Sequence, residues 1–179
     1  MAEEIQGVTW DFDGEQLDPW LAAQRLYKAG FKDADDLAVM WAVMESESGG
    51  YLKAWHHNVT RNEDKTIKIF NDNLMEVKST DLGFIQKNMV HSPTVLLPIE
   101  GDQSKLFVAD LFEAFPDLAR GDLSAKIAFN MWKTRGFQPW YAHTNGSYKK
   151  SMGRACVAVA NFLALKHGLR PMPHVKRIT

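Results

Sequence analysis

The sequence contains a single cysteine, Cys156, which excludes an intramolecular disulfide. Cys156 lies among alanines and valines in a helical pattern, where we expect it to be a small core side chain. No stretch approaches the 18 apolar residues of a membrane-spanning helix, and the acidic start of the chain lacks the apolar segment of a secretory signal. We therefore expect synthesis in the cytosol and no membrane insertion.

Motifs for metal and nucleotide chemistry are missing as well. His56 and His57 are adjacent, and the side chains of neighbouring residues point apart in most backbones, so they do not suggest a chelating pair. The sequence has no His-Glu-x-x-His motif, no glycine-rich phosphate-binding loop and no serine nucleophile elbow. The sequence therefore predicts neither a bound metal nor a cofactor.

The net charge of −1 conceals an uneven distribution along the chain. Residues 123–179 contain ten Lys or Arg and no Asp or Glu, so this segment could attract an anionic polymer, either cell wall or nucleic acid. In one compact domain, however, the acidic remainder of the chain would largely neutralise it. We favour neutralisation and expect no nucleic-acid partner.

The chain reads as one α+β domain over residues 1–179. Its 179 residues are 45% hydrophobic and 24% charged, which suits a single core, and no Pro-, Gly- or Ser-rich linker divides them. Start and stop signals predict helices over 18–30, 34–47, 104–115, 122–135 and 151–167. Only residues 55–90 are rich in strand formers, which predicts a small antiparallel sheet beside a mainly helical body. Residues 168–179 are expected to form a tail.

Glu47 lies in the last turn of the apolar helix 34–47, which Asp33 can cap and Gly49 can end. At 100° per residue Glu47 falls inside the arc of apolar side chains, whereas Glu45 lies beyond its edge. Apolar surroundings and the negative end of a helix dipole both raise the pKa of a carboxyl group. The position therefore predicts a half-buried acid that can protonate a leaving oxygen. The alternative is a frayed helix end that carries a glutamate.

Asp81 has a different setting. Residues 66–70 and 74–78 flank the turn sequence Asn71-Asp72-Asn73, which predicts a β-hairpin. Asp81 follows this hairpin, where hydroxyls and backbone N–H groups would favour its ionised form. A local turn stabilised by the aspartate is the alternative. Two carboxyl groups in unlike environments can divide acid and nucleophile roles, as glycoside hydrolysis requires.

Three segments together carry a resemblance to a known family. The first is Glu47-Ser-Gly-Gly, and the second is Ser79-Thr-Asp-Leu-Gly-Phe-Ile-Gln-Lys-Asn88. The third is Gly136-Phe-Gln-Pro-Trp-Tyr141, followed by Asn145-Gly-Ser-Tyr148. In this order they resemble the catalytic, Ser-Thr-Asp-x-Gly-x-x-Gln-x-Asn and aromatic segments of the lysozyme superfamily. The likeness is closest to the phage-type lysozyme-like and soluble-lytic-transglycosylase domains, and it spans roughly residues 34–150.

The resemblance implies a lysozyme-like fold with the sheet beside the active-site cleft. It implies that Glu47 is the general acid and that Asp81 is the nucleophile or the stabiliser of the oxocarbenium-like transition state. Side chains expected to line the groove and contact sugar are Gln86, Asn88, Trp55, His143, Trp140, Tyr141 and Tyr148. Two features depart from the family pattern: the 34-residue step from Glu47 to Asp81 is long, and Ala142-His-Thr144 replaces the usual Ala-Tyr-Asn of lytic transglycosylases.

The expected function is that of a peptidoglycan muramidase of a bacteriophage, either an endolysin or a virion-associated lysin. It would hydrolyse the β-1,4 bond between N-acetylmuramic acid and N-acetylglucosamine, acting on the cell wall after synthesis in the host cytoplasm. Its expected partners are bacterial peptidoglycan and, if it is mounted on a particle, other phage virion proteins. Two alternatives stay open: a lytic transglycosylase that gives anhydromuramyl products, and a tail or virion structural component that retains the lysozyme fold.

Overall fold

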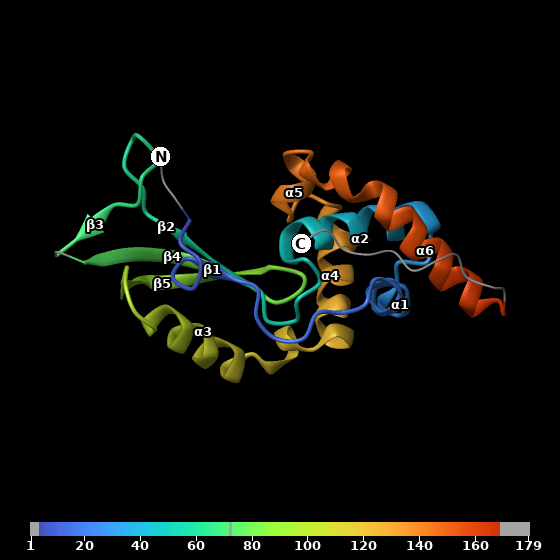
Figure 1. The fold of residues 1–179 in the computed structure, drawn as a ribbon, viewed down its shortest axis with the longest axis horizontal. Helices are drawn as coiled ribbons and strands as arrows, with labels where there is room; N and C mark the ends of the chain where they lie inside the picture. The colour runs from blue at the N-terminus through green and yellow to red at the C-terminus, as the bar shows by residue number, and fades with distance from the viewer. Residues whose placement is uncertain (1–3, 72, 169–179) are drawn as a thin grey trace.

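The computed structural model describes residues 4–71 and 73–168, so most of the expected tail at 168–179 lies outside the described residues. The fold is α+β, with about 49% helix and 21% strand. The sheet lies at one end of the molecule and most helices gather at the other (Figure 1). The helices are α1 (Pro19–Ala29), α2 (Ala34–Ser48), α3 (Gln103–Ala114), α4 (Gly121–Arg135), α5 (Tyr141–Thr144) and α6 (Met152–Lys166), with short 3-10 turns η1 (Pro116–Ala119) and η2 (Ser147–Ser151).

The five helices predicted from capping and periodicity are confirmed to within one residue at each end. Asp33 caps α2 by accepting hydrogen bonds from the backbone N–H groups of Asp35 and Asp36, and Gly49 ends α2 in the left-handed conformation. None of the helices in the described part of the chain is long and apolar enough to cross a membrane.

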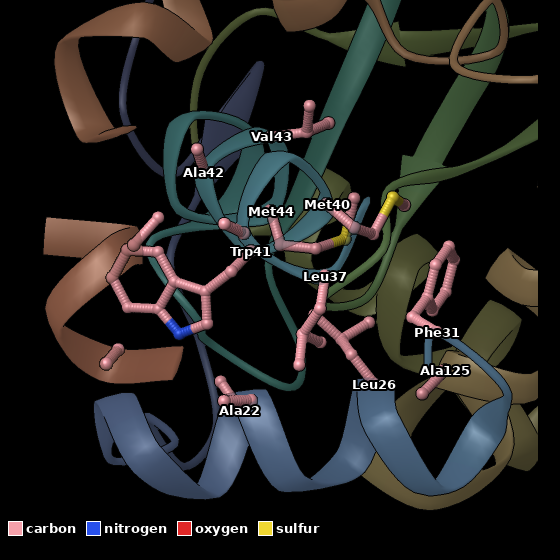
Figure 2. Close-up of a cluster of buried hydrophobic side chains, with 14 of the residues drawn as sticks. Ala22, Leu26, Phe31, Leu37, Met40, Trp41, Ala42, Val43, Met44 and Ala125 are labelled. Carbon is pink, nitrogen blue, oxygen red and sulfur yellow. The ribbon is translucent and has the colours of Figure 1, made fainter. Parts of the chain in front are cut away.

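Helix α2 is the centre of the helical body. Its side chains are buried on nearly every side, as is typical of a helix surrounded by other elements. Leu37 and Trp41 of α2 are directed toward Ala22 and Leu26 of α1 (Figure 2). The indole Nε1 of Trp41 donates a hydrogen bond to the backbone oxygen of Pro19, 2.9 Å away. Because α2 is enclosed, only its C-terminal turn, which carries Glu47, emerges toward the sheet.

The sheet is antiparallel and has five strands: β1 (Trp10–Asp11), β2 (Trp55–Val59), β3 (Ile69–Phe70), β4 (Leu74–Leu82) and β5 (Lys87–Pro98). Strands β2 and β3 pair with one edge of β4, β5 pairs with its other edge, and β1 pairs with β2. The expected hairpin at 66–78 exists only as the short β3–β4 pair, and the main hairpin is β4–β5. The expectation that strands end near residue 90 is wrong. Strand β5 continues to Pro98 despite Pro93, because it pairs on one side only and an edge strand tolerates proline.

A β-bulge at Lys78 decides which face each residue of β4 occupies. Met75 and Val77 are buried before it, whereas Thr80 and Leu82 are buried after it, so the alternation shifts by one residue. The register of β4 against β5 jumps at the same place, between Val77 and Ser79. A bulge of this kind re-aims the side chains that follow it. As a result Asp81 lies on the less buried face of the strand.

Helix α3 covers the other face of the sheet (Figure 1). Val108 and Phe112 of α3 form a buried cluster with Trp55, Leu82 and Leu118. The same face carries the fully buried His57, whose Nδ1 lies 2.8 Å from the hydroxyl of Thr80. Burial, and then the charges of nearby histidines, lowers the pKa of His57 to about 3, so this imidazole is neutral near pH 7.

Candidate active site

A cavity of about 620 Å³ lies between the helical body and the sheet. Glu47 enters it from the end of α2, and Asp81 enters it from β4. The other lining residues are Glu4, Trp10, Phe12, Trp55, His56, Asn58, Gln86 and Tyr141. Two carboxyl groups distant in sequence therefore share one aromatic-walled cavity, in the size range of small-ligand sites.

Glu47 is half-buried, as its helical position predicts. Its Oε1 accepts a hydrogen bond from the backbone N–H of Ala142, 2.7 Å away at the start of α5. Burial raises the pKa of Glu47 and the charge of Asp81 adds to this rise, while the Ala142 hydrogen bond and the cation at His56 oppose it. The net effect is a carboxyl group that keeps its proton to a higher pH than a free glutamate.

The end of α2 is tied to the turn that joins β4 and β5. The buried Ser48 hydroxyl lies 2.7 Å from the backbone oxygen of Phe84 and 3.0 Å from that of Met44. The Trp140 indole Nε1 donates to the backbone oxygen of Ile85, 2.8 Å away. These contacts hold the turn, and with it the end of β4, against the helix that carries Glu47. They set the position of one carboxyl group relative to the other.

The turn itself depends on Gly83 and Gln86. Gly83 has a φ of +80°, and a Cβ there would lie 2.2 Å from the backbone oxygen of Leu118, so only glycine fits. Gln86 also has a positive φ, of 52°. Its Nε2 donates to the backbone oxygens of Ala54 and Gly83 at 3.0 and 2.9 Å. Both amide hydrogens are thereby engaged, which leaves the Gln86 Oε1 as the atom that can accept a hydrogen bond from a ligand.

Asp81 lies between two asparagine amides from the neighbouring strands. Asn58 Nδ2 of β2 is 3.1 Å from Asp81 Oδ2, and Asn88 Nδ2 of β5 is 2.8 Å from Asp81 Oδ1. Both amides also donate to the hydroxyl of Ser79 at 3.0 Å. Asp81 is therefore surrounded by donors, but they are side-chain amides brought in by strand pairing and not the expected hydroxyls and backbone N–H groups. The alternative of a local turn at Asp81 is wrong, because this residue lies within β4.

His56 completes the surroundings of Asp81. Its Nδ1 lies 3.8 Å from Asp81 Oδ2, an ion-pair distance too long for a hydrogen bond, and its Nε2 lies 3.4 Å from Glu4 Oε2. Burial opposes a charge on His56, but the two carboxylates outweigh it and raise the pKa of His56 to about 9. His56 is therefore an imidazolium near neutral pH. Glu4 is held in turn, since His56, Thr9 and Arg61 lower its pKa to about 2 although burial opposes them.

The residues expected to contact sugar fall into three groups. Gln86, Trp55 and Tyr141 line the cavity; Tyr141 is 74% exposed, whereas Trp55 is only 3% exposed and can offer little of its ring. Asn88 contacts Asp81 and is not part of the cavity lining. His143 and Tyr148 stack on each other, with ring centroids 4.8 Å apart, and do not line the cavity.

Trp140 requires a correction. The expectation that it lines the groove and contacts sugar is wrong, because the side chain is 1% exposed and belongs to the helical core. Its indole N–H is used to hold the β4–β5 turn. An aromatic residue near a motif is therefore not enough to predict a stacking platform, since burial decides its role.

The sequence interpretation missed the contribution of the N-terminal segment. Glu4, Trp10 and Phe12 line the cavity although they precede the region of family resemblance. The Phe12 and Tyr51 rings stack at 5.4 Å, and Trp10 packs edge-on against Phe12 at 5.2 Å. The alternation of Val8, Trp10 and Phe12 was a usable signal for a strand with an aromatic face.

His56 and Asn58 were also missed as site residues. The sequence offered a signal for them, since alternation along a strand places both on the face opposite His57. The expected divergence of His56 and His57 is confirmed, because these residues lie on opposite faces of β2. Among residues 4–71 and 73–168, no group of three or more His, Cys, Asp or Glu side chains is arranged to hold a metal ion.

Comparisons with known proteins do not add to this picture. No family model matches the chain, and neither the curated proteins nor the solved structures include a match. The functional argument therefore depends on the chemistry of the cavity.

Proposed function

We propose that this protein is a glycoside hydrolase that cuts the β-1,4 bond between N-acetylmuramic acid and N-acetylglucosamine in peptidoglycan. The observation that carries the proposal is that Glu47 and Asp81 line one cavity from two different elements, in unlike surroundings. Glu47 meets burial and one backbone donor, whereas Asp81 meets two amide donors and a cation. Glycosidases use such a difference to keep one carboxyl group protonated while the other carries charge.

Glu47 has the properties of the general acid. Because Ala142 N–H donates to Oε1, a protonated Glu47 would carry its hydrogen on Oε2 and keep Oε1 as the acceptor. The Oε2–H group could then protonate the oxygen that leaves when the glycosidic bond breaks. The backbone hydrogen bond thus fixes which oxygen delivers the proton.

Asp81 would stabilise the positive charge that develops at the anomeric carbon, or attack that carbon as a nucleophile. Its two asparagine partners and His56 hold the carboxylate in one orientation, so little reorganisation is needed when the cation forms. The aromatic walls from Trp10, Phe12 and Tyr141 suit the apolar faces of sugar rings. We propose a phage lysin as the biological context, either free or mounted on a virion.

The test is wall digestion by the parent protein and by two matched variants. Glu47→Gln should lower activity by about 10²- to 10⁴-fold, the usual contribution of a general acid, and should stay folded because glutamine can still accept the Ala142 N–H. Glu45→Gln, two residues earlier on the same helix, should retain activity. Full activity of Glu47→Gln, or loss of activity in Glu45→Gln alone, would show that the wrong carboxylate has been chosen.

Product analysis separates the proposal from the rival lytic transglycosylase. Hydrolysis in ¹⁸O-labelled water should yield reducing ends that carry one labelled oxygen. A transglycosylase would instead give anhydromuramyl products without label, because the sugar's own hydroxyl attacks. A parent protein that binds walls without cutting them would favour the third alternative, a structural virion component.

A further inference from the structure

A second cavity of about 550 Å³ adjoins the one that holds the carboxyl pair. Glu4, His56, Asn58 and Tyr141 line both cavities, so the two spaces share one wall. The character of the lining changes along this wall. The first cavity is walled by aromatic side chains, whereas the second adds three cationic ones, Arg61, Lys65 and Lys78, to the shared His56.

The loop at residues 61–67 holds Lys65 in place. Arg61 pairs with Ile67 in a β-bridge, and Asn62 N–H donates to the backbone oxygen of Thr66 at 2.9 Å. Arg61 Nη1 also donates to the backbone oxygen of Lys65, 3.0 Å away. Lys65 itself has a φ of +71°, a conformation that a side-chain-bearing residue adopts only where its surroundings enforce it. The loop is therefore braced from several sides at the residue that lines the cavity.

Lys78 reaches the second cavity from the β-bulge of β4. It is exposed, and the register shift at this residue takes it out of the alternation that buries Val77 and Thr80. A bulge next to a site often serves to re-aim one side chain. Lys65 and Lys78 thus come to one cavity from two separate local distortions of the backbone.

The charges in the second cavity do not cancel. Its one carboxylate, Glu4, is already paired with Arg61 and with His56. Lys65 and Lys78 form no ion pair within 4.0 Å in the described part of the chain. Glu76, whose pKa is lowered first by hydrogen bonds from Thr60 and Thr94, feels Lys78 only at longer range. Two ammonium groups are therefore left facing the cavity with no carboxylate in contact.

We propose that the second cavity is an anion-binding subsite that takes acidic substituents carried by the glycan chain. A neutral glycan would not need two ammonium groups beside its binding groove, whereas a glycan with acidic side groups gains from them. Lysine suits this role because its flexible stem lets a point charge follow a mobile substituent. The inference rests on the proposed function and adds to it a preference for acidic over neutral glycans. The anion can be a carboxylate of the sugar or its peptide, or a phosphate of a wall-linked polymer.

The experiment measures binding with the Glu47→Gln protein, so that the polymer is not digested. Four probes are compared: native cell walls, walls stripped of phosphate polymers with hydrofluoric acid, walls whose carboxylates have been amidated, and a neutral chitin oligosaccharide. Lys65→Gln/Lys78→Gln is the test variant. Lys68→Gln/Lys126→Gln is the control, because it removes the same charge from exposed residues that line neither cavity.

The test variant should bind native walls about three- to tenfold more weakly, the range that two solvent-screened charge pairs supply together. It should bind the chitin oligosaccharide as the parent does, and the control should match the parent on every probe. If the anion is a carboxylate, amidation of the wall should weaken its binding to the Glu47→Gln protein by the same factor. If the anion is a phosphate, stripping the wall with hydrofluoric acid should weaken binding by this factor instead. Either result supports the subsite.

Two outcomes would overturn the inference, and they differ in what else they overturn. If the chitin oligosaccharide binds but the test variant and control bind native walls equally, the subsite is wrong while the proposed function stands. If the Glu47→Gln protein binds neither walls nor oligosaccharide and the parent digests no wall, the proposed function fails and the subsite fails with it.

Discussion

Replacement of His56 tests the electrostatic arrangement of the site directly. His56 lies between Glu4 and Asp81, at 3.4 and 3.8 Å, and these carboxylates raise its pKa to about 9 against the opposing effect of burial. Its other titratable neighbours are Glu47, whose pKa the charge of His56 lowers, and His57 on the same strand, which is neutral near pH 7. His56→Gln removes the cation while keeping a side chain that can form hydrogen bonds.

The effect of His56 on stability depends on pH, because a pKa that differs between the folded and unfolded states makes the free energy of unfolding depend on protonation. The pKa of His56 is higher in the folded protein than the ordinary value of 6.5, so protonation stabilises the fold. This stabilisation is complete below pH 6.5 and is lost as the pH rises through 9. A shift from 6.5 to about 9 corresponds to roughly 3.4 kcal/mol without screening. Because the His56 side chain is 36% exposed, solvent reduces this, and we expect about 1 to 2 kcal/mol.

The contact between Glu4 and His56 also makes the stability of the fold depend on pH in the acid range. Its pKa is lowered from 4.5 to about 2, chiefly by its contact with His56, so this stabilisation is present above pH 4.5 and lost as the pH falls through 2. The pKa shifts of His56 and Glu4 both arise in part from the same ion pair, so their stabilising free energies are not added. The alkaline window is the better one for the test, because acid also titrates the other carboxylates of the protein.

The assay is urea unfolding of the parent and His56→Gln at about pH 6 and about pH 9.5, with the free energy of unfolding obtained by linear extrapolation. The stability difference between them should shrink by about 1 to 2 kcal/mol across this interval. His167→Gln, at the exposed end of α6, should show no such change. Parallel stability curves for the parent and His56→Gln, or an NMR titration of His56 near pH 6.5, would refute the arrangement.

Two further predictions concern the site and the turn that supports it. Asp81→Asn should lower wall hydrolysis by about 10²- to 10³-fold while the protein stays folded, and nearly full activity with anhydromuramyl products would reduce Asp81 to a structural residue. Gly83→Ala should destabilise the protein by about 2 to 4 kcal/mol, because its Cβ would meet the Leu118 oxygen at 2.2 Å and its φ is +80°. Gly101→Ala is the matched control: its φ is +81° with no atom within 4 Å, so about 1 kcal/mol is expected, and equal losses in thermal or urea unfolding would show that the clash is unimportant.

The sequence was sufficient to predict the helices and the setting of Glu47. Helix boundaries depend on contacts between residues three or four apart, such as the cap at Asp33, and these can be read along the chain. The half-burial of Glu47 followed from the same periodicity, because its place on the helix relative to the apolar side chains is fixed by 100° per residue.

The setting of Asp81 was decided by tertiary structure. Side chains in a strand alternate with a period of two, so a shift of one residue moves every following side chain to the other face. The bulge at Lys78 makes this shift, and without it Asp81 would share the face of Val77, beneath α3. A bulge becomes visible only when partner strands are present, and here the partners are β2, distant along the chain, and β5, the other strand of the hairpin.

Strand pairing also assembled the groups around Asp81. His56 lies opposite Asp81 because β2 pairs with β4, and Asn88 lies opposite it because β4 pairs with β5. The sequence determined which chemical groups are available and how each helix presents its own. Only the tertiary structure determined which groups meet, because a contact between residues far apart in the chain depends on register and packing, which no local pattern encodes.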